Sequence, residues 1–349
     1  MANPYEALPD QAFWRTAISG RSPFDVSDLW SPRWPISAST RIATFGSCFA
    51  QHFGNALRAR NYCWVDAEQP PATFPSHLRA TFGYGMFSAR TGNIYTTRQL
   101  RQWVEWSLRP AAMPTEYWDY AGRIYDPFRP SIEPNGFASA EEMMALRATT
   151  LHSIAAILRT ADVLVFTLGL TEGWVNGEHG YHYQSCPGTV AGRFSPGLHH
   201  FHNASFAEMV DDLVATRDLI ATVNPAIKIL LTVSPVPLTA TASGRHVLAA
   251  TTHSKSLLRA VAAQFAASNG AVDYFPSYEM ITGAPFRSMF FEPNLRNVNP
   301  VGVDFVMRNF FAALDPEQHD LQRDVPEGAS IVADALCDDA KLEMYGATR

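Results

Sequence analysis

Short apolar runs alternate with longer segments whose apolar residues recur at helical spacing. The runs have the length of buried strands and lie at residues 42–45, 163–167, 227–233 and 272–275. The helical pattern covers residues 48–60, 99–108, 139–160, 205–223, 251–268 and 301–314. Strands that alternate with helices favour a mainly parallel sheet covered by helices on both faces. The pattern therefore predicts an α/β fold.

Several predicted helices carry recognisable end signals. Ser139 and Ser205 each stand three residues before a glutamate, which is the spacing of a capping box. Pro300 is typical of a first helical turn, and Asn269-Gly270 of a helix end. Residues 62–65 are a further strand candidate and bring the predicted sheet to five strands.

The chain divides into three parts by composition. Residues 1–40 are rich in proline and aromatic residues, so we expect an N-terminal arm packed on the domain rather than a disordered tail. Residues 41–314 hold the α/β pattern, with loop-rich insertions. Residues 315–349 are acid-rich and weakly patterned, and we expect a surface tail with one short helix near residues 331–336.

Composition and charge argue against two classes of partner. The 349 residues are 47% hydrophobic and carry a formal charge of −6, with no basic footprint for nucleic acid. We expect no membrane association, because no apolar run reaches the length of a spanning helix and the start has no leader pattern.

The four cysteines lack CxxC spacing, so we expect free thiols and a cytoplasmic location. Oligomeric state is left open.

Ser47 is the candidate nucleophile. It follows the strand at residues 42–45 and the bend at Gly46, and it precedes a helix. Its hydroxyl is expected above the carboxyl end of the strand, near backbone N–H groups that can stabilise an oxyanion. The alternative is that Ser47 only caps the helix, a position that serine favours.

Segments that follow the strands define where other site residues are expected. In a parallel sheet, ligands bind beyond the carboxyl ends of the strands. Residues 46–48, 168–204, 234–250 and 276–299 should therefore meet at one edge. Residues far apart in the sequence are expected to build one site there.

Five sequence blocks resemble a known family. Gly46-Ser47-Cys48-Phe49-Ala50 spells the signature of the GSCFA family, a branch of the SGNH (GDSL-like) hydrolase superfamily. Later blocks follow in the family's order, at residues 92–95, 167–172, 231–236 and 274–279, and the resemblance covers roughly residues 1–312. It implies a flavodoxin-like, three-layer SGNH sandwich.

The resemblance also implies roles for particular residues. Ser47 takes the place of the nucleophile, and the oxyanion donors fall on the backbone of Ser47 and Gly92 and on the side chain of Thr171. A threonine hydroxyl can donate the one hydrogen bond required. Further residues at the same edge are expected to face the substrate, namely Asn93, Glu172, Glu279, Asn294 and Asn297.

The sequence departs from the family pattern at the acid and the base. Asn294 and Asn297 stand where members carry Asp-x-x-His, and an amide cannot take the serine proton. His246 is the first candidate for a replacement base, because its loop follows a central strand. The other candidates are His179, His182, His199, His200, His202 and His253, with Glu172 or Glu279 to orient the imidazole.

Two other chemistries are less favoured. The cluster His199-His200-Phe201-His202 has the spacing of a chelate, but no nearby Asp, Glu or Cys completes a ligand set, so we expect no metal. Cys48 follows Ser47 directly and should point elsewhere on the first helical turn. No phosphate-binding or dinucleotide-binding motif is present, and we expect no cofactor.

Two functions remain from the sequence. The first is a serine ester hydrolase or O-acyltransferase that acts on an acylated sugar or other small metabolite through a Ser47 acyl-enzyme. The second is a retired hydrolase that binds a ligand or partner without turnover. The Ser47 block favours the first function, and the two asparagines favour the second.

Overall fold

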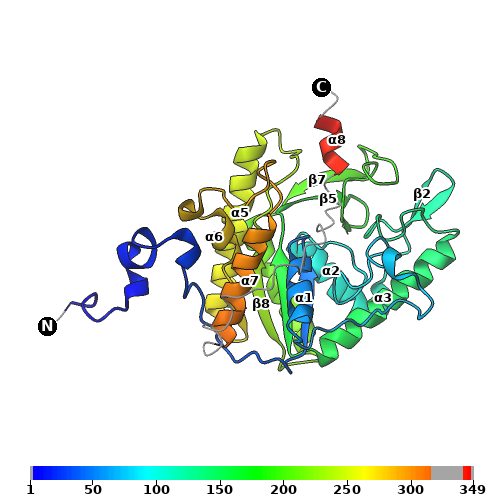
Figure 1. Cartoon of the computed structure of the whole chain (residues 1–349). Helices are drawn as coiled ribbons and strands as arrows, with labels where there is room; N and C mark the ends of the chain where they lie inside the picture. The colour runs from blue at the N-terminus through cyan, green and yellow to red at the C-terminus, as the bar shows by residue number, and fades with distance from the viewer. Residues whose placement is uncertain (1–2, 316–340, 347–349) are drawn as a thin grey trace.

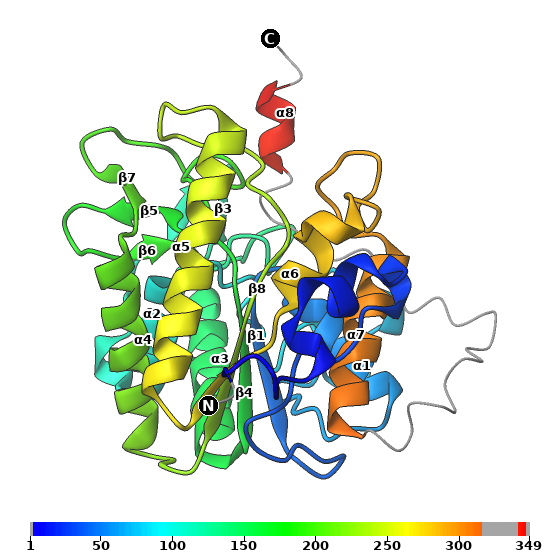
Figure 2. The same cartoon turned by 90° about the vertical axis from the view of Figure 1, so that its left-hand side faces the viewer.

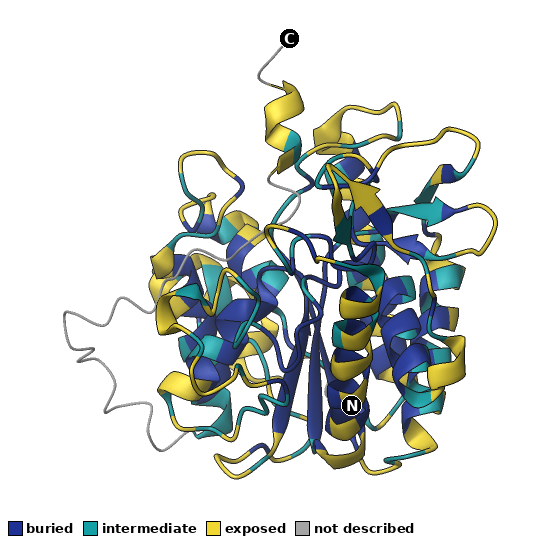
Figure 3. Ribbon diagram, turned by 90° about the vertical axis from the view of Figure 1, so that its right-hand side faces the viewer, coloured by how far each residue is buried: buried dark blue, intermediate teal, exposed yellow. Residues whose placement is uncertain are grey.

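The centre of the molecule is a four-stranded parallel sheet. The computed structural model describes residues 3–315 and 341–346. The strand order is β1-β4-β8-β9, and the strands are Ile42–Gly46, Val163–Leu168, Lys228–Val233 and Val272–Tyr274 (Figure 1). They are buried almost throughout, as Figure 3 shows. The predicted α/β fold with a parallel sheet is confirmed.

Helices cover both faces of the sheet, which gives three layers. The helices are α1 (Ala50–Ala59), α2 (Thr97–Leu108), α3 (Ala140–Thr160), α4 (Phe206–Ala221), α5 (Val247–Ser268), α6 (Ser277–Thr282), α7 (Pro300–Leu314) and α8 (Glu343–Gly346). Short 3₁₀ turns lie at Asp10–Ala12, Pro23–Asp25, Ser76–Leu78, Pro110–Ala112 and Ala284–Phe286, and a π-helical turn at Arg15–Ser19.

Alternate residues of the strands face opposite layers of helices. Ala43 and Phe45 on β1 pack with α2, α3, α4 and α5, whereas Ile42 faces α1, α6 and α7. The same alternation runs through β4, where Leu164 and Val165 point to opposite sides. This is the period-two pattern of a strand buried on both faces.

The local end signals behave as predicted. Ser205 and Glu208 form a capping box at the start of α4, and the Ser139 hydroxyl accepts from the Glu142 amide at 3.2 Å. Pro300 is the first residue of α7. These contacts supply partners for backbone N–H groups that a helix start leaves unpaired.

The predicted fifth strand is wrong. Residues 62–65 make a single parallel bridge, between Trp64 and Ile42, and form no strand. The Trp64 indole turns inward and donates to the Thr44 hydroxyl at 2.8 Å, in the space left by Gly54 of α1. The side chain therefore packs against α1 and the edge of the sheet, and only one residue pairs with β1.

Two loop-rich stretches contain small antiparallel sheets that the sequence did not reveal. Residues 168–204 include the sheet β6-β5-β7, formed by His182–Tyr183, Glu172–Asn176 and His199–Asn203. A hairpin of β2 (Trp118–Tyr120) and β3 (Arg123–Tyr125) lies in the earlier stretch. The three-stranded sheet sits above α2 and α4, beyond the carboxyl end of β4 (Figure 2). It forms part of the edge where ligands are expected.

The N-terminal residues contact the domain through their second half. Trp30 stacks on Phe310 with ring centroids 5.4 Å apart and donates to Asp273. Val26 and Ile36 are buried in the same cluster as α1 and α7. Residues before Val26 are mostly exposed and lie to one side of the molecule in Figure 1. The short helix expected near residues 331–336 lies outside the described residues.

Two expectations from composition meet the structure here. Among the described residues, no helix is long and apolar enough to cross a bilayer. Cys63 and Cys186 are free thiols, but Cys48 is disulfide-bonded. The expectation of four free thiols is therefore wrong.

Candidate active site

Ser47 lies on a sharp turn between β1 and α1. Gly46 has φ +137°, and a Cβ there would come within 2.5 Å of the Thr167 carbonyl oxygen, so only glycine fits. The Ser47 amide donates to that same oxygen at 3.2 Å, and the Ser47 carbonyl accepts from Ala50 at 2.9 Å. The helix begins at Ala50 with Phe49 as its N-cap residue. Ser47 is therefore not the helix cap, which removes the structural alternative for this serine.

Three residues at or close to this turn have buried hydroxyl groups without partners. Ser47 is only 2% exposed, and its Oγ has no hydrogen-bond partner among the described residues. The same holds for the hydroxyls of Thr167, at the end of β4, and Thr171, just beyond it. Buried polar groups in a core are nearly always paired, so a cluster of unpaired ones marks a place adapted to another task.

One wall of the site is the loop at residues 90–93. Ile94 donates its amide to the Gly46 carbonyl at 2.8 Å, which places this loop beside the Ser47 turn. Gly92 has φ +65°, and a Cβ there would lie 2.6 Å from Gln184 Nε2. Asn93 is buried, and its carbonyl accepts from Gln184 at 2.8 Å. The backbone of this loop thus runs beside the turn that carries Ser47, and the Asn93 side chain accepts from Gln51 of α1 at 3.4 Å.

A second wall is the turn at residues 169–172, which bonds the segment just after the first through the Gly169 amide and the Tyr95 carbonyl at 2.9 Å. A Cβ on Gly169 would lie 3.0 Å from Ser47 Cβ, so this turn lies directly against the serine. Two residues of α5 fix it: Lys255 Nζ donates to the Gly169 carbonyl at 2.7 Å, and the Thr171 amide donates to Ser254 Oγ at 3.1 Å. With its amide engaged, Thr171 offers its hydroxyl to the site.

The donors available for an oxyanion follow from these contacts. The Ser47 amide is engaged with the Thr167 carbonyl, so it contributes only when that long bond opens. The Gly92 amide belongs to the first wall, and the buried Thr171 hydroxyl, unpartnered within the described part of the chain, belongs to the second. Among the predicted residues, the structure therefore brings together Ser47, Gly92, Asn93 and Thr171, with Glu172 next to them.

Glu172 is held at the first position of β5. Its Oε1 accepts from the Thr241 hydroxyl at 2.8 Å. Burial raises the pKa of Glu172, whereas the Thr241 hydrogen bond and nearby His253 lower it. Thr241 thereby ties the loop before α5 to the edge of the site.

His246 has a structural role that the sequence did not suggest. It is exposed, and its Nδ1 accepts from the Leu248 amide at 3.2 Å as the N-cap of α5. Ser254, which touches the site, comes eight residues later, about 12 Å along the helix axis. Ser47 Oγ has no imidazole partner among the described residues. The role of His246 as the base stays a prediction.

Three other predicted residues make contacts of their own. Glu279 on α6 pairs with Arg259 of α5 and accepts from the Tyr274 hydroxyl at 2.8 Å. Asn294 is exposed, and its Oδ1 accepts from the amides of Arg296 and Asn297 at 3.0 Å each. Asn297 is also exposed. The amide of Asn294 shapes its own turn, as asparagine commonly does.

The histidines of residues 179–202 lie on the small sheet. Burial and the neighbouring His202 lower the pKa of His182 to about 3, and burial also lowers the pKa of His199. His202 Nε2 lies 3.1 Å from Glu208, whose pKa falls to about 2 because of hydrogen bonds from Ser205. No three His, Cys, Asp or Glu side chains in the described ranges are grouped to hold a metal ion.

Sequence reasoning missed the residues that fix the walls. Lys255 is 1% exposed although it is charged, and its Nζ reaches the Gly169 carbonyl. Its helical spacing to Leu258 and Ala262, both buried, was the available signal: a lysine on an apolar face. No local pattern indicated Gln184 or Ser254.

Comparisons with known proteins identify a family. A family model described as the GSCFA family matches residues 41–310. No curated protein matches the sequence. Among solved structures, the chain is similar to an acetyl xylan esterase, Est2A, from the rumen bacterium Butyrivibrio proteoclasticus. The identity is 12% and the TM-score 0.31, and the match covers 82% of this chain and 66% of that one.

Proposed function

Since the chain belongs to the GSCFA family, whose signature contains Ser47, we propose that it is a serine ester hydrolase or O-acyltransferase. The observation that carries the proposal is the buried, unpartnered Ser47 hydroxyl on a strand-turn-helix junction, next to the unpartnered Thr171 hydroxyl. A nucleophile needs a hydroxyl that is not consumed by structural bonds and donors already in place for the charge that develops.

The proposed chemistry uses residues on both walls. Ser47 Oγ attacks the acyl carbonyl carbon and passes its proton to a histidine base, for which His246 is the first candidate and which later returns the proton to the leaving alcohol. The carbonyl oxygen gains negative charge. The Gly92 amide and the Thr171 hydroxyl donate to that oxygen. The ester C–O bond breaks, the alcohol leaves with a proton, and the acyl group stays on Ser47. Water or the hydroxyl of an acceptor then attacks the acyl-enzyme, which gives hydrolysis or acyl transfer.

The proposed substrate is an acyl ester of a sugar or another small metabolite. The expectation comes from the resemblance to SGNH hydrolases. The site agrees with a neutral acyl group in one respect: uncharged groups, Gly92, Asn93 and Thr171, line the two walls beside Ser47.

A Ser47→Ala variant tests the proposal. We expect ester turnover and labelling by a fluorophosphonate probe to disappear, because both need the nucleophile. We also expect no loss of thermal stability, since Ser47 Oγ makes no hydrogen bond with any described residue and is not a helix cap. Wild-type turnover in a folded Ser47→Ala protein would remove Ser47 from the mechanism.

The second candidate is a retired hydrolase that binds a ligand without turnover. It is favoured by one observation, that no imidazole among the described residues contacts Ser47 Oγ. This interpretation predicts a wild-type protein that neither turns over aryl acetates nor reacts with the probe. Ester turnover that depends on Ser47 would exclude it.

A further inference from the structure

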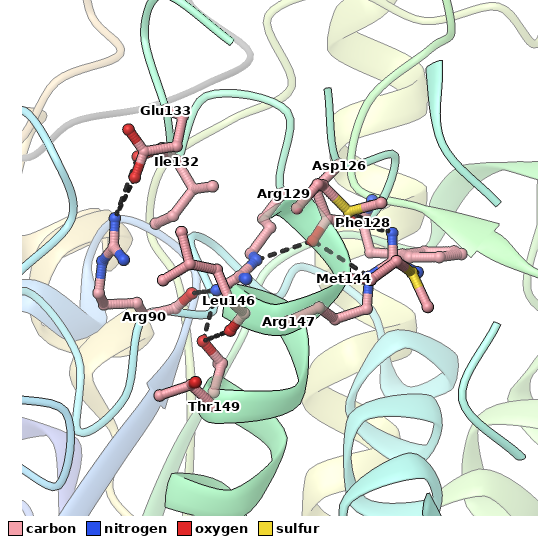
Figure 4. A network of polar contacts seen from close by, with 12 residues as sticks. Arg90, Asp126, Phe128, Arg129, Ile132, Glu133, Met144, Leu146, Arg147 and Thr149 are labelled. Carbon is pink, nitrogen blue, oxygen red and sulfur yellow. Dashed lines mark hydrogen bonds and ion pairs between the residues drawn. The ribbon is translucent and has the colours of Figure 1, made fainter. Parts of the chain in front are cut away.

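A buried network of charged side chains lies behind the loop at residues 90–93. Asp126, Arg129 and Arg147 are fully buried, and Arg90 and Glu68 nearly so (Figure 4 draws all of these but Glu68). Arg129 and Arg147 both bond Asp126, at 2.9 and 2.8 Å. Burial opposes ionisation, but the two guanidinium groups lower the pKa of Asp126, which holds its charge.

Stability alone does not account for this network, because removing charges from water costs more than most buried ion pairs return. With Glu133 at its outer end, three acids face three arginines, so its charges balance internally. Nothing in that balance calls for a bound ligand. We therefore expect the role of the network to lie in the backbone groups that its side chains hold in place.

Two bonds of the network end on the backbone of Arg90, whereas Arg147 holds the carbonyls of Pro114 and Glu116. The Arg90 amide donates to Glu68 Oε2 at 2.9 Å, and the Arg90 carbonyl accepts from Arg129 Nη1 at 2.7 Å. Thr150 links Arg129 to Glu68: its hydroxyl accepts from Arg129 Nη1 at 2.5 Å and can donate to Glu68 Oε1 at 2.9 Å or to the Leu146 carbonyl at 3.2 Å. Two residues after Arg90, Gly92 lies near Arg129, since a methyl group on Gly92 would be 3.7 Å from Arg129 Cβ.

We propose that Thr150 and Arg129 are positioning residues, which hold the loop at residues 90–93 so that the Gly92 amide stays aimed at the space above Ser47. The proposal deepens the function proposed above and rests on it for its catalytic consequence. The physical reason is preorganisation: a donor stabilises an oxyanion fully only when it is already in place, and a displacement of about 1 Å costs on the order of 10²-fold in rate.

The test compares Thr150→Val with two matched variants. Valine keeps the shape of threonine and removes the hydroxyl, whereas Thr150→Ser keeps the hydroxyl. Thr149→Val makes the same change one residue earlier, at an exposed position whose hydroxyl bonds only within α3, to Ala145 at 3.0 Å. All three are measured for kcat and KM on an aryl acetate and for amide hydrogen exchange in peptides that cover residues 90–94.

For Thr150→Val we expect exchange in residues 90–94 to rise at least tenfold, kcat to fall about 10- to 100-fold, and KM to stay within about twofold. Thr150→Ser and Thr149→Val should match the wild type in all three. A fall in kcat without faster exchange, or faster exchange with wild-type kcat, would overturn the proposal. A purely structural role would lower the melting temperature and leave kcat and KM unchanged at 25 °C.

Two other results have a defined meaning. If the wild type shows no ester turnover, the proposed function fails, and the exchange contrast between Thr150→Val and Thr149→Val alone decides whether the network holds the loop. If Thr150→Val does not fold, Arg129→Lys replaces it, because lysine keeps the positive charge but cannot bond Asp126, the Arg90 carbonyl and the Thr150 hydroxyl at once as the guanidinium does. Wild-type exchange in residues 90–94 of Arg129→Lys would then overturn the proposal.

Discussion

Gly92 offers the sharpest test of the proposed geometry. Its φ of +65° lies in the left-handed region, where an L side chain costs about 1–2 kcal/mol. A methyl group there would also lie 2.6 Å from Gln184 Nε2, so that amide must move and give up its 2.8 Å bond to the Asn93 carbonyl. Loss of that bond adds about 0.5–1.5 kcal/mol. We therefore expect Gly92→Ala to lower the free energy of unfolding by about 1.5–3.5 kcal/mol.

The same change should disable the site in the folded protein. Moving Gln184 and straining residue 92 should displace the Gly92 amide from its proposed place as an oxyanion donor, and loss of one such donor lowers kcat by on the order of 10²–10³-fold. The assay is turnover of p-nitrophenyl acetate at a temperature where the variant is folded, with urea unfolding followed in parallel. A folded Gly92→Ala protein with wild-type kcat would refute the assignment of the Gly92 amide as a donor.

Gly122→Ala supplies the control. Gly122 has φ +75° in the turn of the β2–β3 hairpin, and a methyl group there meets no atom within 4 Å. Gly122→Ala should therefore lower the free energy of unfolding by about 1–2 kcal/mol through backbone strain alone and leave ester turnover unchanged. The double variant Gly92→Ala/Gln184→Ala removes the clash. Its loss in free energy of unfolding should therefore be smaller than the sum of the losses of the two single variants. Strict additivity would show that the clash has been overestimated.

Two further predictions concern histidines. His246→Ala should cost about 0.5–2 kcal/mol of stability through loss of the α5 cap. If His246 is the base, the same change should also lower ester turnover about 10²-fold or more in the folded protein. Turnover within about threefold of the wild type would remove His246 from the mechanism. His182 has a folded pKa of about 3, so between pH 6.5 and 3 the unfolded chain binds the extra proton and stability falls by about 1.4 kcal/mol per pH unit as pH decreases. Urea unfolding between pH 5 and 6.5, above the range where Glu208 titrates, should show a shallower slope for His182→Gln, and an unchanged slope would contradict the low pKa.

The local elements of this protein are determined by its sequence. The apolar runs predicted β1, β4, β8 and β9, and the helical spacing predicted the major helices to within a few residues. The Ser205 capping box and the Gly46 turn followed from the chemistry of single residues. These features depend on contacts between near neighbours, and the geometry of backbone hydrogen bonding imposes a period that a sequence displays directly.

The membership of the site was decided mainly by tertiary structure. The family resemblance predicted that Gly92 and Thr171 lie near Ser47. No pattern in the sequence indicated that Lys255 and Ser254 hold the turn at residues 169–172 beside it. Glu279, equally plausible from its place after a strand, pairs with Arg259 instead. Residues 62–65 have the composition of a strand and form one bridge, because Trp64 packs into the space beside Gly54. Which side chains come into contact depends on how distant segments pack and on where each helix lies along the sheet. The distances between such side chains are fixed only when the whole core is assembled.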